Sequence, residues 1–329
     1  MTPDPMAQHA LSLPPDVVAR LVDLRVHQPQ RVLDAARTRQ RRSRLAGPNG
    51  RLVLLAADHP ARMVTAAGGD PLALADRWGL LARIAAVLEE PGVDGVMGTA
   101  DLLDDLLLLD EVRMERGEAP LLRERVLVGS MNRGGLAGSR FELDDRFTGY
   151  TARGIAAMGL DGGKLLVRVD PDDPGTVATL EAAARAVDAL ADLGLAAFVE
   201  VLPVRKVEGR LAVTVEAEAL AAVVGVATGL GSSSRHVWLK LPACPGYDRV
   251  ARATTCPILL LGGDVAPAEA VLRETAEALA AGPTVRGVLM GRNVLFPSAG
   301  TPRTMARAVA ALVHEGVGFT EARRLLEVG

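Results

Sequence analysis

The chain has 329 residues, of which 49% are hydrophobic and 23% charged; this is ordinary for a folded globular protein and long enough for one large domain. Its formal net charge of −3 argues against nucleic-acid binding, which normally needs a strongly basic face. The N-terminus lacks the basic start and apolar run of a signal peptide, and no apolar stretch is long and clean enough to span a bilayer. The chain has only two cysteines, Cys244 and Cys256, so we expect a reduced, cytoplasmic protein. From the charge and the lack of a membrane span, we expect no nucleic-acid and no membrane partner.

Residues 1–48 are predicted to be a helical extension. A helical pattern with one apolar face runs over residues 16–24. The following segment, residues 31–45, is crowded with arginine, and we interpret it as a solvated or interface helix rather than a nucleic-acid-binding one. The turn cluster at residues 47–50 separates this extension from the second predicted unit, residues 49–329.

Short apolar runs alternate with helical stretches in the second unit. The runs are uniformly apolar, as expected for strands that are covered on both faces. Eight strand–helix units in about 280 residues predict a closed parallel (β/α)8 barrel, the TIM-barrel fold. A doubly wound open sheet is the alternative, although no GxGxxG follows the first run, which weakens its dinucleotide-binding form. The eight runs are residues 52–57, 95–98, 126–129, 165–169, 197–202, 237–241, 258–261 and 288–290.

Lysine is unusually rare in this chain. Lysine and arginine together number 37, yet the only lysines are Lys164, Lys206 and Lys240. Arginine stays protonated and cannot act as an amine nucleophile, whereas a buried lysine can lose its proton. The positions of the remaining lysines are therefore informative.

Lys240 lies inside the apolar run of residues 237–241, near the carboxyl end of a strand, where barrel enzymes place their chemistry. A buried ammonium is costly unless it is paired or neutral. Burial and nearby cations depress the pKa of a lysine, which prepares the amine to form an imine. The pattern thus favours a nucleophilic lysine over the alternative, a structural ion pair.

Three further polar residues lie within the predicted strands or at their ends. Lys164 begins one run, and as a second cation it could lower the pKa of Lys240; a solvated strand start is the equally weighted alternative. Glu200 interrupts another run and could act as a general acid/base or as an ion-pair partner of the lysines. Asp58 ends the first run and is predicted to face the barrel mouth, with a helix N-cap or loop role as the alternative.

Glycines follow the last two predicted strands. Gly262 and Gly263 come after the seventh, and Gly291 and Arg292 come after the eighth. Barrel enzymes often bind phosphate with these two loops. Glycine lets backbone N–H groups approach a phosphate and arginine adds a bidentate fork, so we predict a phosphate site here. Tight strand-to-helix turning is the alternative.

His59, Arg133 and Arg168 are weaker candidates for binding substrate. His59 follows Asp58 but precedes a proline, which indicates a loop, and Arg133 belongs to a polar, glycine-containing segment over residues 130–138. The five histidines show no metal-ligand spacing such as HxH or HExxH. We therefore expect no metal and no cofactor.

Four short motifs in this order resemble the class I (Schiff-base) aldolases of the deoxyribose-phosphate, fructose-bisphosphate and tagatose-bisphosphate group, the tagatose-1,6-bisphosphate enzymes most closely. The resemblance extends over about residues 50–300. In this family the first strand usually continues with a different sequence after the aspartate that corresponds to Asp58. Residues 129–135 also differ from the bisphosphate enzymes. The motifs are Lys-Leu-Leu at 164–166 with Asp-Pro at 170–171, Phe-Val-Glu-Val-Leu at 198–202, Trp-Leu-Lys-Leu-Pro at 238–242 and Gly-Val-Leu-Met-Gly-Arg at 287–292.

The resemblance implies a role for each matching residue. Lys240 would be the Schiff-base lysine and Glu200 the acid/base, with Lys164 and Asp58 positioning substrate hydroxyls and assisting proton transfer. The phosphate would be held by Gly263, Gly291 and Arg292. No metal would be needed.

The chain as a whole also resembles actinobacterial aldolase-like proteins associated with inositol catabolism. That likeness implies cleavage of 2-deoxy-5-keto-gluconate 6-phosphate to dihydroxyacetone phosphate and malonate semialdehyde. Separately, we expect a homo-oligomer whose partner is a small-molecule sugar phosphate. The alternatives are a tagatose-bisphosphate, fructose-bisphosphate or deoxyribose-phosphate aldolase, a barrel isomerase with Glu200 as base, and a non-catalytic sugar-phosphate sensor that uses the arginine-rich segment.

Overall fold

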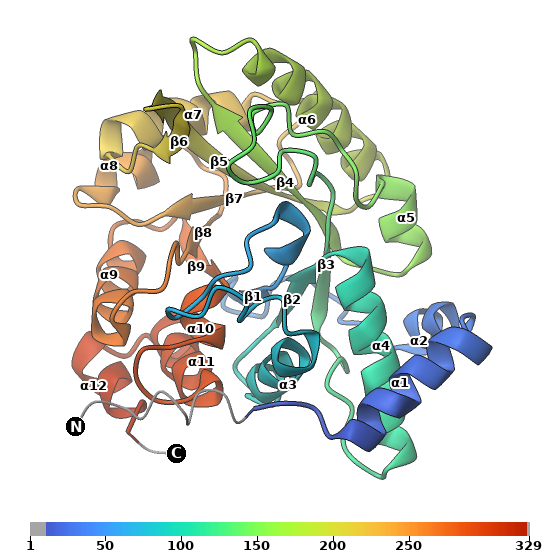
Figure 1. The fold of residues 1–329 in the computed structure, drawn as a ribbon. Helices are drawn as coiled ribbons and strands as arrows, with labels where there is room; N and C mark the ends of the chain where they lie inside the picture. Colours follow the sequence, from blue (N-terminus) through green and yellow to red (C-terminus); the bar gives the residue numbers. More distant parts are fainter. Residues whose placement is uncertain (1–10, 328–329) are drawn as a thin grey trace.

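Eight parallel strands pair around a closed ring in the computed structural model, which describes residues 11–327 (Figure 1). Each strand pairs with the next along the chain, β4 pairs with β5, and β9 returns to β1. The predicted (β/α)8 barrel is confirmed. Its strands are β1 (Leu52–Ala56), β2 (Gly95–Gly98), β3 (Val126–Ser130), β4 (Gly162–Val169), β5 (Ala196–Val207), β7 (Val237–Pro242), β8 (Ile258–Leu261) and β9 (Val285–Met290).

Helices surround the barrel and cover the outer faces of its strands (Figure 1). Because both faces of each strand are covered, the strands are uniformly apolar, as the sequence indicated. The helical segments are α1 (Pro15–His27), α2 (Arg31–Thr38), η2 (Pro60–Arg62), α3 (Arg77–Leu88), α4 (Ala100–Glu115), α5 (Ala152–Ala157), α6 (Gly175–Asp192), α7 (Ala217–Thr228), α8 (Tyr247–Arg252), α9 (Ala268–Ala280), α10 (Arg292–Leu295), α11 (Pro302–Ala310), η3 (Ala311–Glu315) and α12 (Phe319–Arg324).

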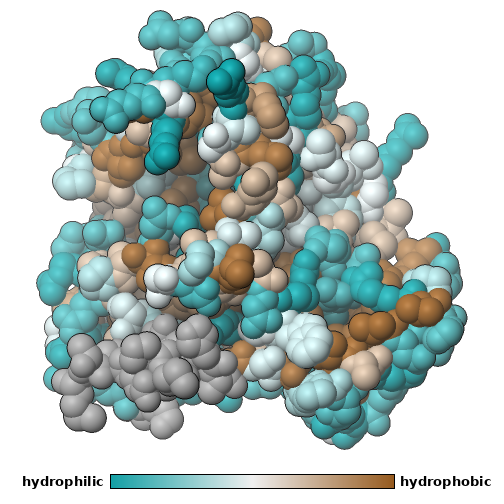
Figure 2. All heavy atoms as spheres, in the orientation of Figure 1, coloured by the Kyte–Doolittle hydropathy of each residue, from teal (hydrophilic) through white to brown (hydrophobic). Residues whose placement is uncertain are grey.

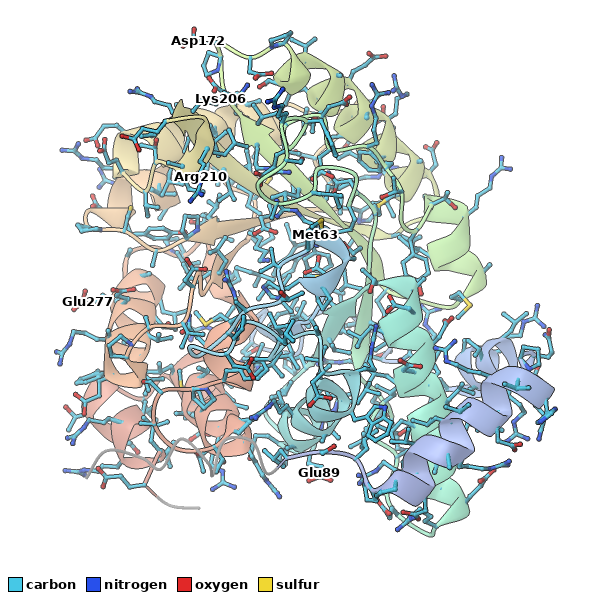
Figure 3. All side chains as sticks on the ribbon, in the orientation of Figure 1. Met63, Glu89, Asp172, Lys206, Arg210 and Glu277 are labelled. Carbon is cyan, nitrogen blue, oxygen red and sulfur yellow. The ribbon has the colours of Figure 1, made fainter. Side chains whose placement is uncertain are left out.

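One strand lies outside the barrel and was not predicted. Strand β6 (Arg210–Val213) pairs antiparallel with the far end of β5, which runs to Val207 rather than ending near residue 202. The two residues between the strands, Glu208 and Gly209, have φ of 50° and 80°, which suits a two-residue hairpin turn. Lys206 and Arg210 of this hairpin are labelled in Figure 3.

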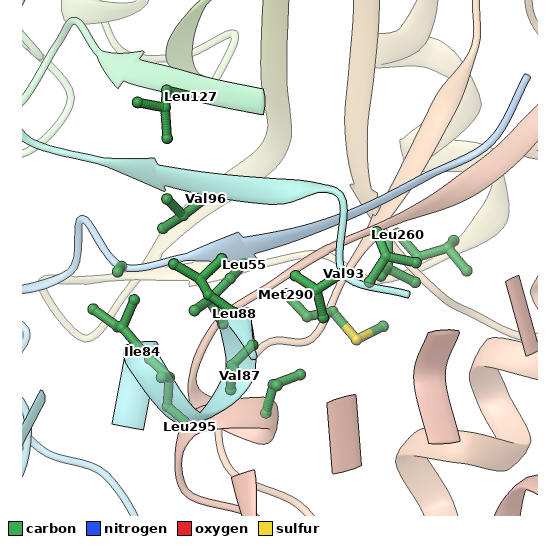
Figure 4. Close-up of a cluster of buried hydrophobic side chains, with 14 of the residues drawn as sticks. Leu55, Ile84, Val87, Leu88, Val93, Val96, Leu127, Leu260, Met290 and Leu295 are labelled. Atoms are coloured by element: carbon green, nitrogen blue, oxygen red, sulfur yellow. The ribbon is translucent and has the colours of Figure 1, made fainter. Parts of the chain in front are cut away.

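Side chains alternate between the inside of the barrel and the surrounding helices. On the outside, Leu55 and Val96 of neighbouring strands pack with Leu88 of α3 (Figure 4). The inward-facing residues form a separate apolar cluster, as in other filled barrels. Its members are Leu52, Leu54, Ala56, Met97, Val126, Val128, Ala196, Phe198, Leu259 and Leu289.

The segment before the first strand covers the amino ends of the strands. Helices α1 and α2 both pack against α4 (Figure 1). Helix α2 ends at Thr38, shorter than predicted, and the chain then continues irregularly to Leu45 and Ala46, which pack against the barrel's interior cluster. The arginine-rich segment is therefore an interface with the barrel. The predicted boundary between residues 48 and 49 stays a prediction.

Two arginines of this segment pair with aspartates that immediately precede barrel strands. Arg41 contacts Asp161 at 3.0 Å and Arg42 contacts Asp94 at 2.7 Å. Asp161 also accepts a hydrogen bond from the backbone N–H of Leu127. Arg41 and Arg42 are therefore paired with the barrel. A partner-binding role for the segment would need such arginines to be unpaired.

No helix formed by residues 11–327 combines the length and the apolar character that a membrane span requires. Hydrophobic side chains are nevertheless visible along α1 (Figure 2), where Val22 and Val26 are largely exposed. The expected homo-oligomer stays a prediction.

Candidate active site

Five polar side chains continue the inward-facing alternation of the barrel beyond its apolar layers. Asp58 lies two residues after the inward Ala56, and Glu200 lies two residues after the inward Phe198. The strand register places Glu200 directly opposite Lys240 on β7. The polar group therefore lies at the carboxyl ends of the strands, where barrel enzymes have their active sites. Its members are Asp58, Ser130, Lys164, Glu200 and Lys240.

One carboxylate joins the two buried lysines. The Glu200 Oε2 atom is 2.5 Å from the Lys164 Nζ atom and 3.1 Å from the Lys240 Nζ atom. Lys164 is 1% exposed and Lys240 is 5% exposed. The structure thus brings together the three residues that the sequence singled out, and both lysines are engaged rather than solvated.

Asp58 forms the other half of the cluster. Its Oδ2 atom accepts a hydrogen bond of 2.9 Å from the Ser130 hydroxyl and lies 3.5 Å from the Lys164 Nζ atom. The same oxygen contacts the Arg133 guanidinium, which is also buried. Asp58 therefore faces the other site residues rather than capping a helix. Ser130 had no signal of its own in the sequence beyond its place at the end of a strand.

Burial and charge shift the pKa values of this cluster in opposite directions. Burial lowers the pKa of Lys240, and burial together with the charge of Arg133 lowers the pKa of Lys164 well below its usual range. Burial alone would raise the pKa of Glu200, but the charges of Lys164 and Lys240 outweigh it and hold the pKa well below the usual value. The site therefore combines an ionised carboxylate with amines that are easily deprotonated.

Hydrogen bonds join the loops after β8 and β9, where the sequence predicts a phosphate site that stays a prediction. Gly263 has a φ of +65° and open space where a Cβ would lie. The Arg292 guanidinium contacts Asp264, and its buried Nε atom has no hydrogen-bond partner among the described residues. Asn293, which sequence reasoning missed, ties the loops together: its side-chain amide donates to the carbonyl oxygens of Gly262 and Asp264.

Gly291 has a packing reason to be glycine. A Cβ at this position would collide with the ring of His59 and with the carbonyl oxygen of Ala56. The missing side chain therefore makes room for His59, which lies against the loop that follows β9. Phosphate binding by Gly291 stays a prediction.

Arg168 belongs to an outer cluster of charges rather than to the group around Lys240. Its guanidinium contacts Glu142 and lies 3.2 Å from the Asp145 carboxylate, and Arg62 reaches Glu142 at 3.0 Å. These pairs fix the segment between β3 and α5 against the loop after β1, which carries Met63 (Figure 3). The structure thus gives Arg168 a structural ion pair, and its predicted contact with substrate stays untested.

The segment over residues 130–138 divides its polar side chains between two tasks. Arg133 faces Asp58, as described above. The buried side-chain amide of Asn132 exchanges two hydrogen bonds with the backbone of Leu166, of 2.6 and 2.7 Å. Asn132 therefore fixes strand β4.

Within the described residues, no three histidine, cysteine, aspartate or glutamate side chains are grouped as a metal ion would require. The two cysteines, Cys244 and Cys256, are both free thiols.

Comparison with known families shows where the chain belongs. The sequence profile of the Cgl0159-like family matches residues 50–313, the whole barrel. The chain belongs to the Cgl0159-like family. A crystal structure of Cgl0159 from Corynebacterium glutamicum is similar at 39% identity with a TM-score of 0.86, covering 93% of this chain and 99% of that one. A search of curated protein sequences gave no significant match.

More distant solved structures share the fold of this Cgl0159-like protein. A Schiff-base-forming fructose-1,6-bisphosphate aldolase is 20% identical with a TM-score of 0.59, covering 86% of this chain and 100% of that one. A fructose-bisphosphate aldolase from Slackia heliotrinireducens is 14% identical with a TM-score of 0.62, covering 98% of this chain and 95% of that one. At these identities the likeness establishes the barrel fold alone.

Proposed function

We propose that this protein is a class I aldolase that cleaves a phosphorylated keto-sugar acid through an imine on Lys240. The observation that carries the proposal is the buried Lys164–Glu200–Lys240 group at the carboxyl ends of the strands. The proposed substrate is 2-deoxy-5-keto-gluconate 6-phosphate, a compound of inositol breakdown, and the products are dihydroxyacetone phosphate and malonate semialdehyde. The resemblance to Schiff-base aldolases supports this reading.

The first step forms the imine. The neutral amine of Lys240 attacks the substrate's ketone carbon and gives a carbinolamine. The Glu200 carboxylate, 3.1 Å from the Lys240 Nζ atom, transfers a proton from the attacking nitrogen to the oxygen, and a second proton taken up from solvent lets this oxygen leave as water. The product is a protonated imine. Burial favours this step because it lowers the pKa of Lys240 and so raises the share of neutral amine.

The second step breaks the carbon–carbon bond. A base removes the proton from the hydroxyl on the carbon that becomes the aldehyde, and the electrons of the broken bond move into the protonated imine to give an enamine. Glu200 is the proposed base. Lys164 contacts Glu200 and also approaches Asp58, so it can share the proton. The enamine carbon is then protonated, and water releases the ketone product and regenerates Lys240.

Arg133 supports a substrate whose aldehyde half is acidic. Burial lowers the pKa of Arg133 only to about 10, so the guanidinium is charged at neutral pH. It joins Lys164 and Lys240 beside Asp58 and Glu200, and its buried Nε atom has no hydrogen-bond partner among the described residues. An anionic group on the departing aldehyde would pair with this guanidinium, as the carboxylate of malonate semialdehyde does.

A panel of phosphorylated substrates tests this assignment. We expect 2-deoxy-5-keto-gluconate 6-phosphate to be cleaved with a higher kcat/KM than tagatose 1,6-bisphosphate, fructose 1,6-bisphosphate or deoxyribose 5-phosphate. The measurement is release of the ketone or aldehyde product under identical conditions. A clear preference for a bisphosphate would assign the chain to a bisphosphate aldolase, and binding without turnover of any substrate would favour a sensor.

Arg292 is the proposed ligand of the substrate phosphate, together with Gly262, Gly263 and Gly291. Arg292→Ala is expected to raise KM by roughly ten- to a hundredfold, because a hydrogen bond to a charged group contributes about 1.5–3 kcal/mol. Initial rates over a range of substrate concentrations measure the effect. Arg303→Ala is the matched control, since Arg303 is half-exposed and lies on α11 near Glu89 and Glu90. An unchanged KM in the Arg292 variant would remove this assignment.

A further inference from the structure

His59 holds a buried ring nitrogen that has no partner. Its Nδ1 atom is shielded from solvent and makes no hydrogen bond to any group among residues 11–327. Leaving such a group unsatisfied destabilises the folded protein. Nearly all buried polar groups in native proteins are paired, so an orphan needs an explanation. One explanation is a ligand that forms a hydrogen bond with the His59 Nδ1 atom.

The chain is built to keep the ring in this place. Gly291 lacks the Cβ that would collide with the His59 ring, so the loop after β9 closes directly onto it. Arg292 follows at once, and Asp58 precedes His59 in the chain. The ring thus lies where the proposed phosphate loop meets the catalytic cluster.

The surroundings also keep the ring uncharged. Burial, and then the positive charges of Arg292 and Lys240, lower the pKa of His59 to about 3. Near neutral pH the ring is therefore a neutral imidazole, which donates one hydrogen bond and accepts another. A neutral donor beside Arg292 can bind a phosphate oxygen without adding to the positive charge around Lys240.

We propose that His59 is a positioning residue that hydrogen-bonds the phosphate of the ketone half of the substrate, between the Lys240 amine and the Arg292 guanidinium. The inference rests on the proposed function, because it takes the ketone phosphate as the ligand. His59 aligns the ketone carbon with Lys240 and takes no part in moving protons.

The first experiment is kinetic trapping of the imine with borohydride, using either dihydroxyacetone phosphate or unphosphorylated dihydroxyacetone. His59→Leu is expected to raise the half-saturating concentration of dihydroxyacetone phosphate about tenfold, as for one lost hydrogen bond, and to leave that of dihydroxyacetone unchanged. His59→Asn, which keeps a polar group near the Nδ1 position, is expected to recover part of the loss. The control is His236→Leu, because His236 directly precedes β7 at the opposite end of the barrel.

Thermal unfolding separates this role from a structural one. His59→Leu is expected to keep or raise Tm, because it removes the unsatisfied ring nitrogen. If His59→Leu lowers Tm and also lowers the affinity for both ketones, His59 only supports the fold. Equal half-saturating concentrations of dihydroxyacetone phosphate in the variant and the wild type would also overturn the proposal.

A second measurement does not depend on catalysis. The chain has five histidines, so the ring nitrogen signals can be resolved by NMR and that of His59 assigned with the His59→Asn variant. Inorganic phosphate is expected to shift the His59 signal in the wild-type protein and not the His236 signal. If no imine is trapped but the signal shifts, the aldolase assignment fails and His59 remains a phosphate ligand. An unshifted signal overturns the His59 proposal while leaving the aldolase test untouched.

Discussion

Lys240→Arg should abolish aldol cleavage while leaving the fold intact. Arginine keeps a positive charge beside Glu200 but cannot form an imine, because its guanidinium stays protonated and is not an amine nucleophile. Turnover should fall to the background rate, whereas the far-ultraviolet circular dichroism spectrum should match that of the wild type. Steady-state product release is the measurement.

Lys206→Arg is the matched control for this change. Lys206 is half-exposed on the β5–β6 hairpin and pairs with Asp173 at 2.5 Å, far from the barrel centre in Figure 3. This variant should retain wild-type activity. Substantial turnover by the Lys240 variant would rule out an essential imine at that residue.

Glu200→Gln should lower kcat by about 10²- to 10⁴-fold, the usual contribution of a general acid/base. The change also removes a charge that raises the pKa of Lys240. With that charge gone, Lys240 should lose its proton at lower pH. The acid limb of the pH profile for imine trapping should therefore move to lower pH in the variant, although cleavage itself is slow.

The control for Glu200 is Glu181→Gln on α6, where the glutamate is exposed and pairs with Arg185 on the same helix. Neither kcat nor the trapping profile should change in that variant. An acid limb that moves to higher pH in Glu200→Gln would contradict the described electrostatics of the site. An unchanged kcat would remove Glu200 from proton transfer.

The fold was predictable because its pattern is repeated along the chain. Each barrel strand is apolar on both faces, and every predicted strand is present. The hairpin from Val204 to Val213 was missed because its residues are mostly exposed and rich in charge, and because they continue a barrel strand beyond the ring. The two-residue Glu208–Gly209 turn was an available signal.

The candidate site was predictable to the extent that strand ends define it. Asp58, Lys164, Glu200 and Lys240 are brought together because the carboxyl ends of parallel strands meet at one rim of a barrel. Their catalytic roles stay predictions.

Contacts that depend on the path of a loop were not predictable in the same way. Arg133 reaches Asp58 from the segment after β3, and its pairing follows from how that segment folds back. Whether Arg168 forms an ion pair likewise depends on the positions of Glu142 and Asp145, which are set by the path of the segment that carries them. A glycine such as Gly291 shows its packing reason only once its neighbour His59 is in place.

Trapping the intermediate tests the central claim most directly. The wild-type protein is incubated with dihydroxyacetone phosphate and borohydride in the presence of EDTA, then digested and analysed by mass spectrometry. Lys240 imine formation predicts a stable mass increase on the peptide that contains Lys240, undiminished by EDTA. An adduct on Lys164 instead, or an adduct that forms only when a divalent metal is supplied, would contradict the mechanism.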